Sequence, residues 1–172
     1  MIILSLREET VLFVICLVII LVLAVADQLF KYLIVSNYSL NELHNVISFG
    51  KHKIFSLTYV KNSGAAWSIM AGKSWFLIGI PIVIIIVGFI YLYKKRNSSK
   101  FLTISLSMLL AGGIANLIDR IRFKEVIDYI KFEPINFPVF NFADICVVLG
   151  GIMFCIYFIF IDGKKKKPHN RS

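Results

Sequence analysis

Two aspartates, Asp128 and Asp144, are the residues of this sequence best suited to breaking a covalent bond. One follows an apolar run and the other begins the next, with fifteen residues between them. Two carboxyl groups held close together cannot both ionise easily, so such a pair shares a proton. The ionised member can act as general base on a water molecule, while the protonated member polarises a carbonyl group. The chemistry predicted from this pair is hydrolysis of a peptide bond.

Asp144 also has a purely structural interpretation. It stands three residues after Asn141 at the start of an apolar run, which is the spacing of an N-cap residue and a capping-box acid. A negative charge is favoured in the first turn of a helix as well. Capping would explain Asp144 alone, but the combination with Asp128 favours the hydrolytic interpretation.

Further polar side chains gather at the ends of the same apolar runs, where ionisable groups are costly and are therefore functional candidates. Asp27 and Lys31 are four residues apart on one helix face, and an internal ion pair explains them without a catalytic role. Asn116 and Arg120 share a face in the same way, and Arg120 is also favoured as a cation near a helix C-terminus. The remaining candidates are Asp119, Asn141, and Asn62 with Gly64, which are typical of a tight turn.

Four apolar runs must position these residues. Of the 172 residues 58% are apolar, and the mean hydropathy is +0.80, which is more apolar surface than a soluble fold of this length can bury. A helix needs about 20 residues to cross a hydrocarbon core, and each run is close to that length. We therefore predict an all-α membrane protein with a single domain over residues 1–172. The predicted spans cover residues 11–35, 75–93, 101–118 and 142–161.

Basic residues predict the orientation of these spans. The net charge of +9 arises beside the apolar runs, as in membrane proteins, so no nucleic-acid partner is expected. Lysines and arginines crowd the link 94–100 and the tail 162–172, which the positive-inside rule assigns to the cytoplasm together with both termini. Segments 36–74 and 119–141 are then outside.

The first outer segment contains two stretches rich in β-forming residues. Residues 47–49 and 54–60 partly alternate between apolar and polar side chains, and Gly50 lies between them. This pattern predicts a small extracytoplasmic β-sheet on the outer surface of the membrane.

Three other interpretations stay open at this stage. Residues 24–26 have the small-residue pattern of a signal-peptide cleavage site, although Glu8 and Glu9 weaken the basic start that such a peptide needs. A serine protease could use Ser105 or Ser107, but neither has a base within helical reach. A non-enzymatic four-span protein, such as a small transporter or an assembly factor, would also carry intramembrane charges, although it would need them near mid-membrane.

Five short motifs resemble those of one family, the lipoprotein signal peptidases, also called signal peptidase II. They occur in the family's order and spacing, and they extend from the first span to the fourth. One such motif is a weak signal, but five in order are specific. The motifs are Asp27-Gln28-x-x-Lys31, Asn62-x-Gly64-Ala65-Ala66-Trp67, Asn116-Leu117-Ile118-Asp119-Arg120, Val126-x-Asp128 and Asn141-x-Ala143-Asp144.

The resemblance implies an aspartyl endopeptidase of the bacterial plasma membrane with its active site at the outer face. Its substrates would be prolipoproteins whose lipobox cysteine already carries a diacylglyceryl group. The enzyme would cut just before that cysteine and release the signal peptide. Globomycin-type cyclic peptides would inhibit it, membrane lipid would surround it, and neither a metal nor a cofactor would be needed. We expect a monomer.

The resemblance also implies roles for individual residues. Asp128 and Asp144 would be the catalytic pair. Because Asp144 lies in the first turn of a helix, which stabilises its charged form, we predict that Asp144 is the ionised base and that Asp128 starts protonated. The substrate-binding residues would be Asn62, Gly64, Asn116, Arg120 and Asn141, and the supporting polar residues would be Asp27, Lys31 and Asp119.

Two positions depart from the family pattern. Ala115 and Lys124 stand where the family usually has glycine. Alanine in a helix is a mild change, whereas Lys124 is demanding if its position requires a positive φ. The sequence therefore leaves open the conformation of the loop before Asp128.

Overall fold

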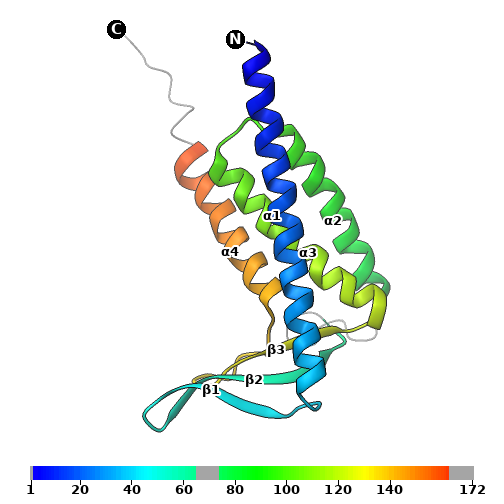
Figure 1. Ribbon diagram of the computed structural model, residues 1–172, viewed down its shortest axis with the longest axis vertical. Coiled ribbons are helices and arrows are strands. Elements are labelled where there is room, and N and C mark those ends of the chain that lie inside the picture. The colour runs from blue at the N-terminus through cyan, green and yellow to red at the C-terminus, as the bar shows by residue number, and fades with distance from the viewer. Residues whose placement is uncertain (1, 65–73, 163–172) are drawn as a thin grey trace.

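Over residues 2–64 and 74–162, which the computed structural model describes, the chain forms four long helices and one small sheet (Figure 1). The predicted fold class, an all-α membrane protein with a small sheet, is confirmed. The helices are α1 (Ile2–Asn37), α2 (Ser74–Lys94), α3 (Lys100–Phe123) and α4 (Phe142–Ile156), and α4 continues into the π-helical turn η2 (Tyr157–Asp162). The strands are β1 (Leu43–Phe49), β2 (His52–Asn62) and β3 (Val126–Phe132).

All four helices are long and apolar enough to cross a membrane. Among the stretches long and apolar enough to span, the third differs most from its expected bounds, because it continues to Phe123 instead of ending at 118. Asp119 and Arg120 therefore lie on a helix, whereas the sequence placed the start of an outer segment at 119. The spanning stretches are Thr10–Asn37, Trp75–Lys94, Lys100–Phe123 and Phe142–Asp162.

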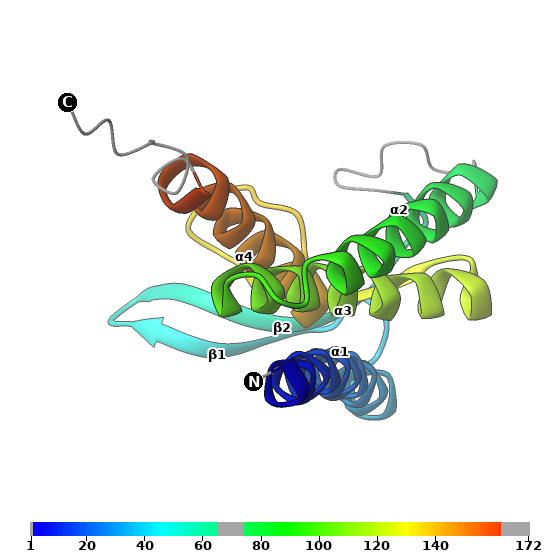
Figure 2. The same ribbon diagram turned by 90° about the horizontal axis from the view of Figure 1, so that it is seen from above.

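Helix α3 is the centre of the bundle and contacts α1, α2 and α4 (Figure 2). More than half of its spanning stretch, 56%, is buried inside the protein, against at most 22% for any other helix. The outer helices therefore present most of their apolar surface to lipid. The buried core combines Leu102, Leu106, Leu110 and Ala111 of α3 with Cys16 and Ile20 of α1, Leu92 of α2 and Tyr157 of η2.

A glycine on α3 permits its close approach to α4. A Cβ atom added at Gly112 would overlap the carbonyl oxygen of Ala143 and lie 2.7 Å from Cγ2 of Val147. Small residues allow such close backbone contact between membrane helices. Because Ala143 directly precedes Asp144, this contact also sets how far the first turn of α4 stands from α3.

The three strands form one antiparallel sheet in the order β1-β2-β3. It lies at the end of the bundle opposite the start of α1 and the α2–α3 link (Figure 1). Gly50, with a φ of 60°, turns the chain between β1 and β2, at its place between the two β-rich stretches of the sequence. Strand β3 was not predicted, although its residues Val126-Ile-Asp-Tyr-Ile-Lys-Phe132 are rich in β-formers.

The structure shows the backbone conformation of Lys124, in the loop before β3, which the sequence had left open. This residue is the C-cap of α3 in the left-handed conformation, with a φ of 63°, and its N–H donates to the carbonyl of Arg120. A lysine therefore occupies a position that favours glycine.

The Gly112→Ala substitution is expected to lower the free energy of unfolding by about 1–3 kcal/mol, the usual cost of overpacking a tight contact. Thermal unfolding of the protein in detergent micelles measures this. The matched control is Gly113→Ala, because a Cβ atom at Gly113 meets only the Ile85 side chain, at 3.7 Å. Equal melting temperatures for both variants would contradict the proposed close contact.

The Lys124→Gly substitution is expected to stabilise the protein by about 1 kcal/mol, because glycine carries no penalty in the left-handed conformation. The same thermal assay checks it. Ile121→Gly, inside α3, is the control and should destabilise the protein by about 1 kcal/mol. A lower melting temperature for Lys124→Gly would rule out strain at this position.

Candidate active site

Asp128 and Asp144 line the same pocket, at the sheet end of the bundle. The pocket has a volume of about 320 Å³. Its apolar rim comes from residues 137–140 of the loop before α4 and from Val147 and Val148 on α4. The structure thus brings five of the predicted site residues together around one pocket: Asn62, Asn116, Arg120, Asp128 and Asp144.

Asp128 is positioned by the sheet and is 2% exposed. It pairs with Val60 across the β2–β3 ladder. Its Oδ2 accepts a hydrogen bond from Nδ2 of Asn62 at 2.9 Å, and its Oδ1 accepts one from Nδ2 of Asn141 at 2.7 Å. Burial raises the pKa of Asp128 to about 7, and the neighbouring carboxylate of Asp144 adds to the rise, while the hydrogen bonds from Asn62 and Asn141 oppose it.

Asp144 is positioned by the start of α4. The backbone N–H of Asp144 donates to Oδ1 of Asn141 at 2.9 Å, and Oδ2 of Asp144 accepts from the Asn141 N–H at 3.1 Å, which completes a capping box. The other carboxylate oxygen, Oδ1, accepts from Nδ2 of Asn116 at 2.8 Å. The capping interpretation is therefore correct, and the cap holds the carboxylate beside the pocket.

Arg120 and Gly64 are joined through the backbone. The Arg120 guanidinium donates to the Gly64 carbonyl at 3.3 Å. The Gly64 N–H donates in turn to Oδ1 of Asn62 at 3.0 Å, an Asx-type turn of the kind that Asn-x-Gly predicts. Gly64 therefore acts on the site through its peptide groups. The rest of its motif, residues 65–67, lies outside the described residues.

Behind the pocket, Lys31 is buried at 2% exposure and bonds to three acceptors. Its ammonium lies 2.7 Å from Oδ2 of Asp27, 2.8 Å from Oδ2 of Asp119 and 3.0 Å from Oδ1 of Asn116. An ammonium group has three N–H donors, so each has a partner. The ion pair of Asp27 with Lys31 that the four-residue spacing suggested is present, and Asp119 belongs to the same cluster.

Asp27 and Asp119, the two aspartates that bind Lys31, also accept hydrogen bonds from the backbone of α4 and β3. Oδ1 of Asp27 accepts from the Ala143 N–H at 2.9 Å, in the first turn of α4. Oδ2 of Asp119 accepts from the Ile127 N–H at 3.2 Å, in β3. Gln28, to which sequence reasoning gave no role, donates to Oδ1 of Asp119 at 2.9 Å. These bonds fix the residues next to Asp144 and Asp128 in the chain.

Two predicted substrate-binding residues are turned towards the aspartates. Asn141 is fully buried, at 0% exposure, and its amide bonds to Asp128 and to Asn116. Asn116 is 8% exposed, and its amide bonds to Lys31, Asn141 and Asp144. The polar atoms of both side chains are therefore already engaged within the protein.

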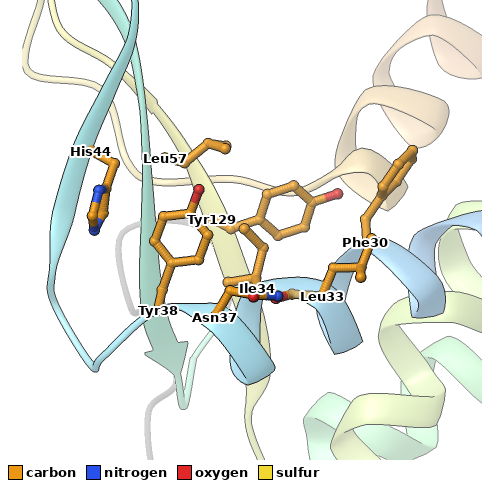
Figure 3. A pocket seen from close by; sticks show the side chains of 8 residues that line it. All are labelled: Phe30, Leu33, Ile34, Asn37, Tyr38, His44, Leu57 and Tyr129. Carbon is orange, nitrogen blue, oxygen red and sulfur yellow. The ribbon is translucent and has the colours of Figure 1, made fainter.

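Sequence reasoning missed Tyr129, the neighbour of Asp128 on β3. Its hydroxyl accepts the Phe142 N–H at 3.2 Å at the start of α4. Figure 3 shows Tyr129 in a second pocket, of about 580 Å³, between the end of α1 and the sheet. No aspartate lines that pocket. The alternation of side chains along a strand could have placed Tyr129 on the opposite face from Asp128, had β3 been predicted.

The serine alternative finds no support in the geometry of α3. Ser105 and Ser107 are fully buried, and their hydroxyls donate to the helix carbonyls of Leu102 and Thr103, at 2.7 Å and 2.8 Å. This is the local bonding by which serine commonly satisfies itself within a helix.

Four helices are long and apolar enough to span a membrane, and two buried or half-buried carboxyl groups line one pocket. These features are those of a multi-pass membrane protein with a candidate site for hydrolysis. A family model described as signal peptidase (SPase) II matches residues 19–160. The chain therefore belongs to the signal peptidase II family, and the non-enzymatic four-span interpretation is set aside.

Individual relatives agree with this assignment. A lipoprotein signal peptidase of Latilactobacillus sakei is 42% identical over 151 residues, which cover 87% of this chain and 95% of that protein. One from Enterococcus faecalis is 39% identical over 144 residues, covering 84% and 87%. A solved bacterial membrane enzyme, determined by the in meso method at 2.3 Å resolution, superposes with a TM-score of 0.78 at 31% identity, covering 91% of this chain and 94% of its own.

Proposed function

We propose that this protein removes signal peptides from prolipoproteins by cutting just before a cysteine that carries a diacylglyceryl group. The relatives are lipoprotein signal peptidases by name, which supports a prolipoprotein substrate. The observation that carries the proposal is that Asp128 and Asp144 share one pocket but differ in their surroundings. One carboxyl is buried on a strand, and the other caps a helix.

In the proposed reaction, Asp128 begins protonated and Asp144 ionised. Asp144 removes a proton from a water molecule as that water attacks the scissile carbonyl carbon, while Asp128 donates its proton to the carbonyl oxygen. The tetrahedral intermediate, which now carries two hydroxyl groups, then collapses: Asp144 gives the proton it had taken to the nitrogen, and Asp128 takes a proton back from one hydroxyl. The C–N bond breaks, the new carboxyl group and the amine of the cysteine are released, and both aspartates return to their starting states. The raised pKa of Asp128 supports this division of roles.

Arg120 and Asn62 are the residues proposed to hold the substrate backbone. Both line the pocket. Arg120 has five N–H donors, and the bonds to the carbonyls of Gly64 and Asn116 use two of them, so the others can reach a peptide carbonyl of the substrate. One amide hydrogen of Asn62 is donated to Asp128, and the second can be donated to the substrate. Asn116 and Asn141 are proposed instead to hold the catalytic pair.

The lipid on the substrate suits the proposed orientation. The basic link 94–100 favours a cytoplasmic position for the end of the bundle away from the sheet, which leaves the pocket at the outer face of the bacterial plasma membrane. Val147 and Val148 on its rim are 37% and 58% exposed, so the acyl chains can stay in lipid while the peptide reaches the aspartates. Since one chain supplies every site residue, we propose that the monomer is active.

Asp128→Asn and Asp144→Asn are each expected to lower cleavage of a diacylglyceryl-modified precursor by at least about a thousandfold, because either change removes a proton-transfer group. Release of the signal peptide in proteoliposomes measures this, and a globomycin-type peptide should reproduce the loss. Glu42→Gln, an exposed carboxyl on the same side of the membrane, should cleave normally. Cleavage by a doubly substituted Asp128→Asn, Asp144→Asn protein would refute the mechanism.

The pH dependence tests which aspartate carries the proton. Because Asp128 must be protonated and its pKa is about 7, kcat/KM should fall as pH rises above that value, approaching about tenfold per pH unit. A profile of kcat/KM against pH in a buffer of constant ionic strength checks this. An activity that continues to rise through the alkaline range would contradict a protonated Asp128.

A further inference from the structure

The three asparagines around the aspartates are each held by a group that can only donate hydrogen bonds. Oδ1 of Asn62 accepts from the Gly64 N–H, and Oδ1 of Asn141 accepts from the Asp144 N–H. Oδ1 of Asn116 accepts from the Lys31 ammonium. A backbone N–H or an ammonium cannot accept, so each amide must present its oxygen to that donor and its NH2 group to the other side.

The other side is, in every case, a carboxylate of the catalytic pair. The Asn62 and Asn141 amides donate to Asp128, and the Asn116 amide donates to Asp144. In all three side chains the NH2 group, and not the oxygen, bonds to these carboxylates. A proton on the pair therefore finds no acceptor among these amides and can be delivered only within the pair or into the pocket.

Asn116 differs from the other two because side chains, and not the backbone, hold its oxygen: the Lys31 ammonium and Nδ2 of Asn141 both donate to it. The backbone N–H groups that bond to Asn62 and Asn141 belong to the tight turn and to the capping box, respectively. Lys31 is 85 residues distant in sequence and reaches Asn116 from α1 at 3.0 Å. Both partners are buried, so water does not compete for the bond.

We propose that Lys31 is a positioning residue for the reaction: it acts through Asn116 on Asp144, in addition to neutralising Asp27 and Asp119. Without the ammonium, the Asn116 oxygen keeps only the 3.1 Å bond from Nδ2 of Asn141, so the amide is held less firmly in the orientation that donates to Asp144. This inference rests on the proposed peptidase function. It assigns Lys31 a role in turnover that an ion pair alone does not require.

Two effects of Lys31 must be separated, since its removal leaves Asp27 and Asp119 buried without a cation. The Lys31→Met, Asp119→Asn double variant removes one of these negative charges together with the ammonium. Its melting temperature should recover relative to Lys31→Met alone, because less buried charge is unpaired. Its kcat should stay about 10- to 100-fold below that of Asp119→Asn, the range found when a group that orients a reactive side chain is lost.

Adding Asn116→Ala to the Lys31→Met, Asp119→Asn variant tests whether Lys31 acts through Asn116. If Lys31 acts through Asn116, the triple variant is no slower in kcat than the Asp119→Asn, Asn116→Ala double variant, because the amide that Lys31 orients is already gone. Multiplied losses in kcat, or full recovery of kcat in the Lys31→Met, Asp119→Asn variant, would overturn the proposal. Wild-type protein is assayed on the same precursor, so that failure of the proposed function, in which wild type does not cut, is distinguished from failure of this inference.

Discussion

One buried ammonium group, that of Lys31, organises the active-site end of this protein. Removing a lysine from water is unfavourable unless all of its donors are satisfied by charged or polar acceptors, and here two carboxylates and an amide do so. Because Asp27 belongs to α1 and Asp119 to α3, the group joins these two helices directly. Removal of one partner from such a cluster usually costs about 3–5 kcal/mol, since an uncompensated charge stays buried.

The same cluster extends beyond the two helices that contain it. Asp27 accepts a backbone N–H of α4, and Asp119 accepts one of β3. The start of α4 and the start of β3 also carry Asp144 and Asp128, the aspartates proposed to be catalytic. Helix packing through Gly112 and the capping box at Asn141 complete the constraint. The aspartates are therefore held by neighbours on several elements, as precise proton transfer requires.

The two aspartates obtain different chemistry from different secondary structure. A strand interior offers Asp128 burial and amide donors but no favourable dipole, whereas the first turn of α4 offers Asp144 backbone N–H groups and the positive end of the helix dipole. This difference in surroundings supports the proposed assignment of the shared proton to Asp128. The amide network points N–H donors at both carboxylates, since the oxygen of each asparagine side chain is bonded to another donor.

The four spans, the cap of Asp144 and the pairing of Asp27 with Lys31 could be predicted from the amino-acid sequence, because hydropathy and helical spacing act over a few residues. The sequence also carried the family motifs that single out Asp128. The bonds of Lys31 to Asp119 and Asn116, the strand β3 and the left-handed conformation of Lys124 became visible only in the folded chain. These features depend on contacts between residues up to about ninety positions apart in the chain. Local propensity cannot specify such contacts, since they arise only when α3 packs between its neighbours.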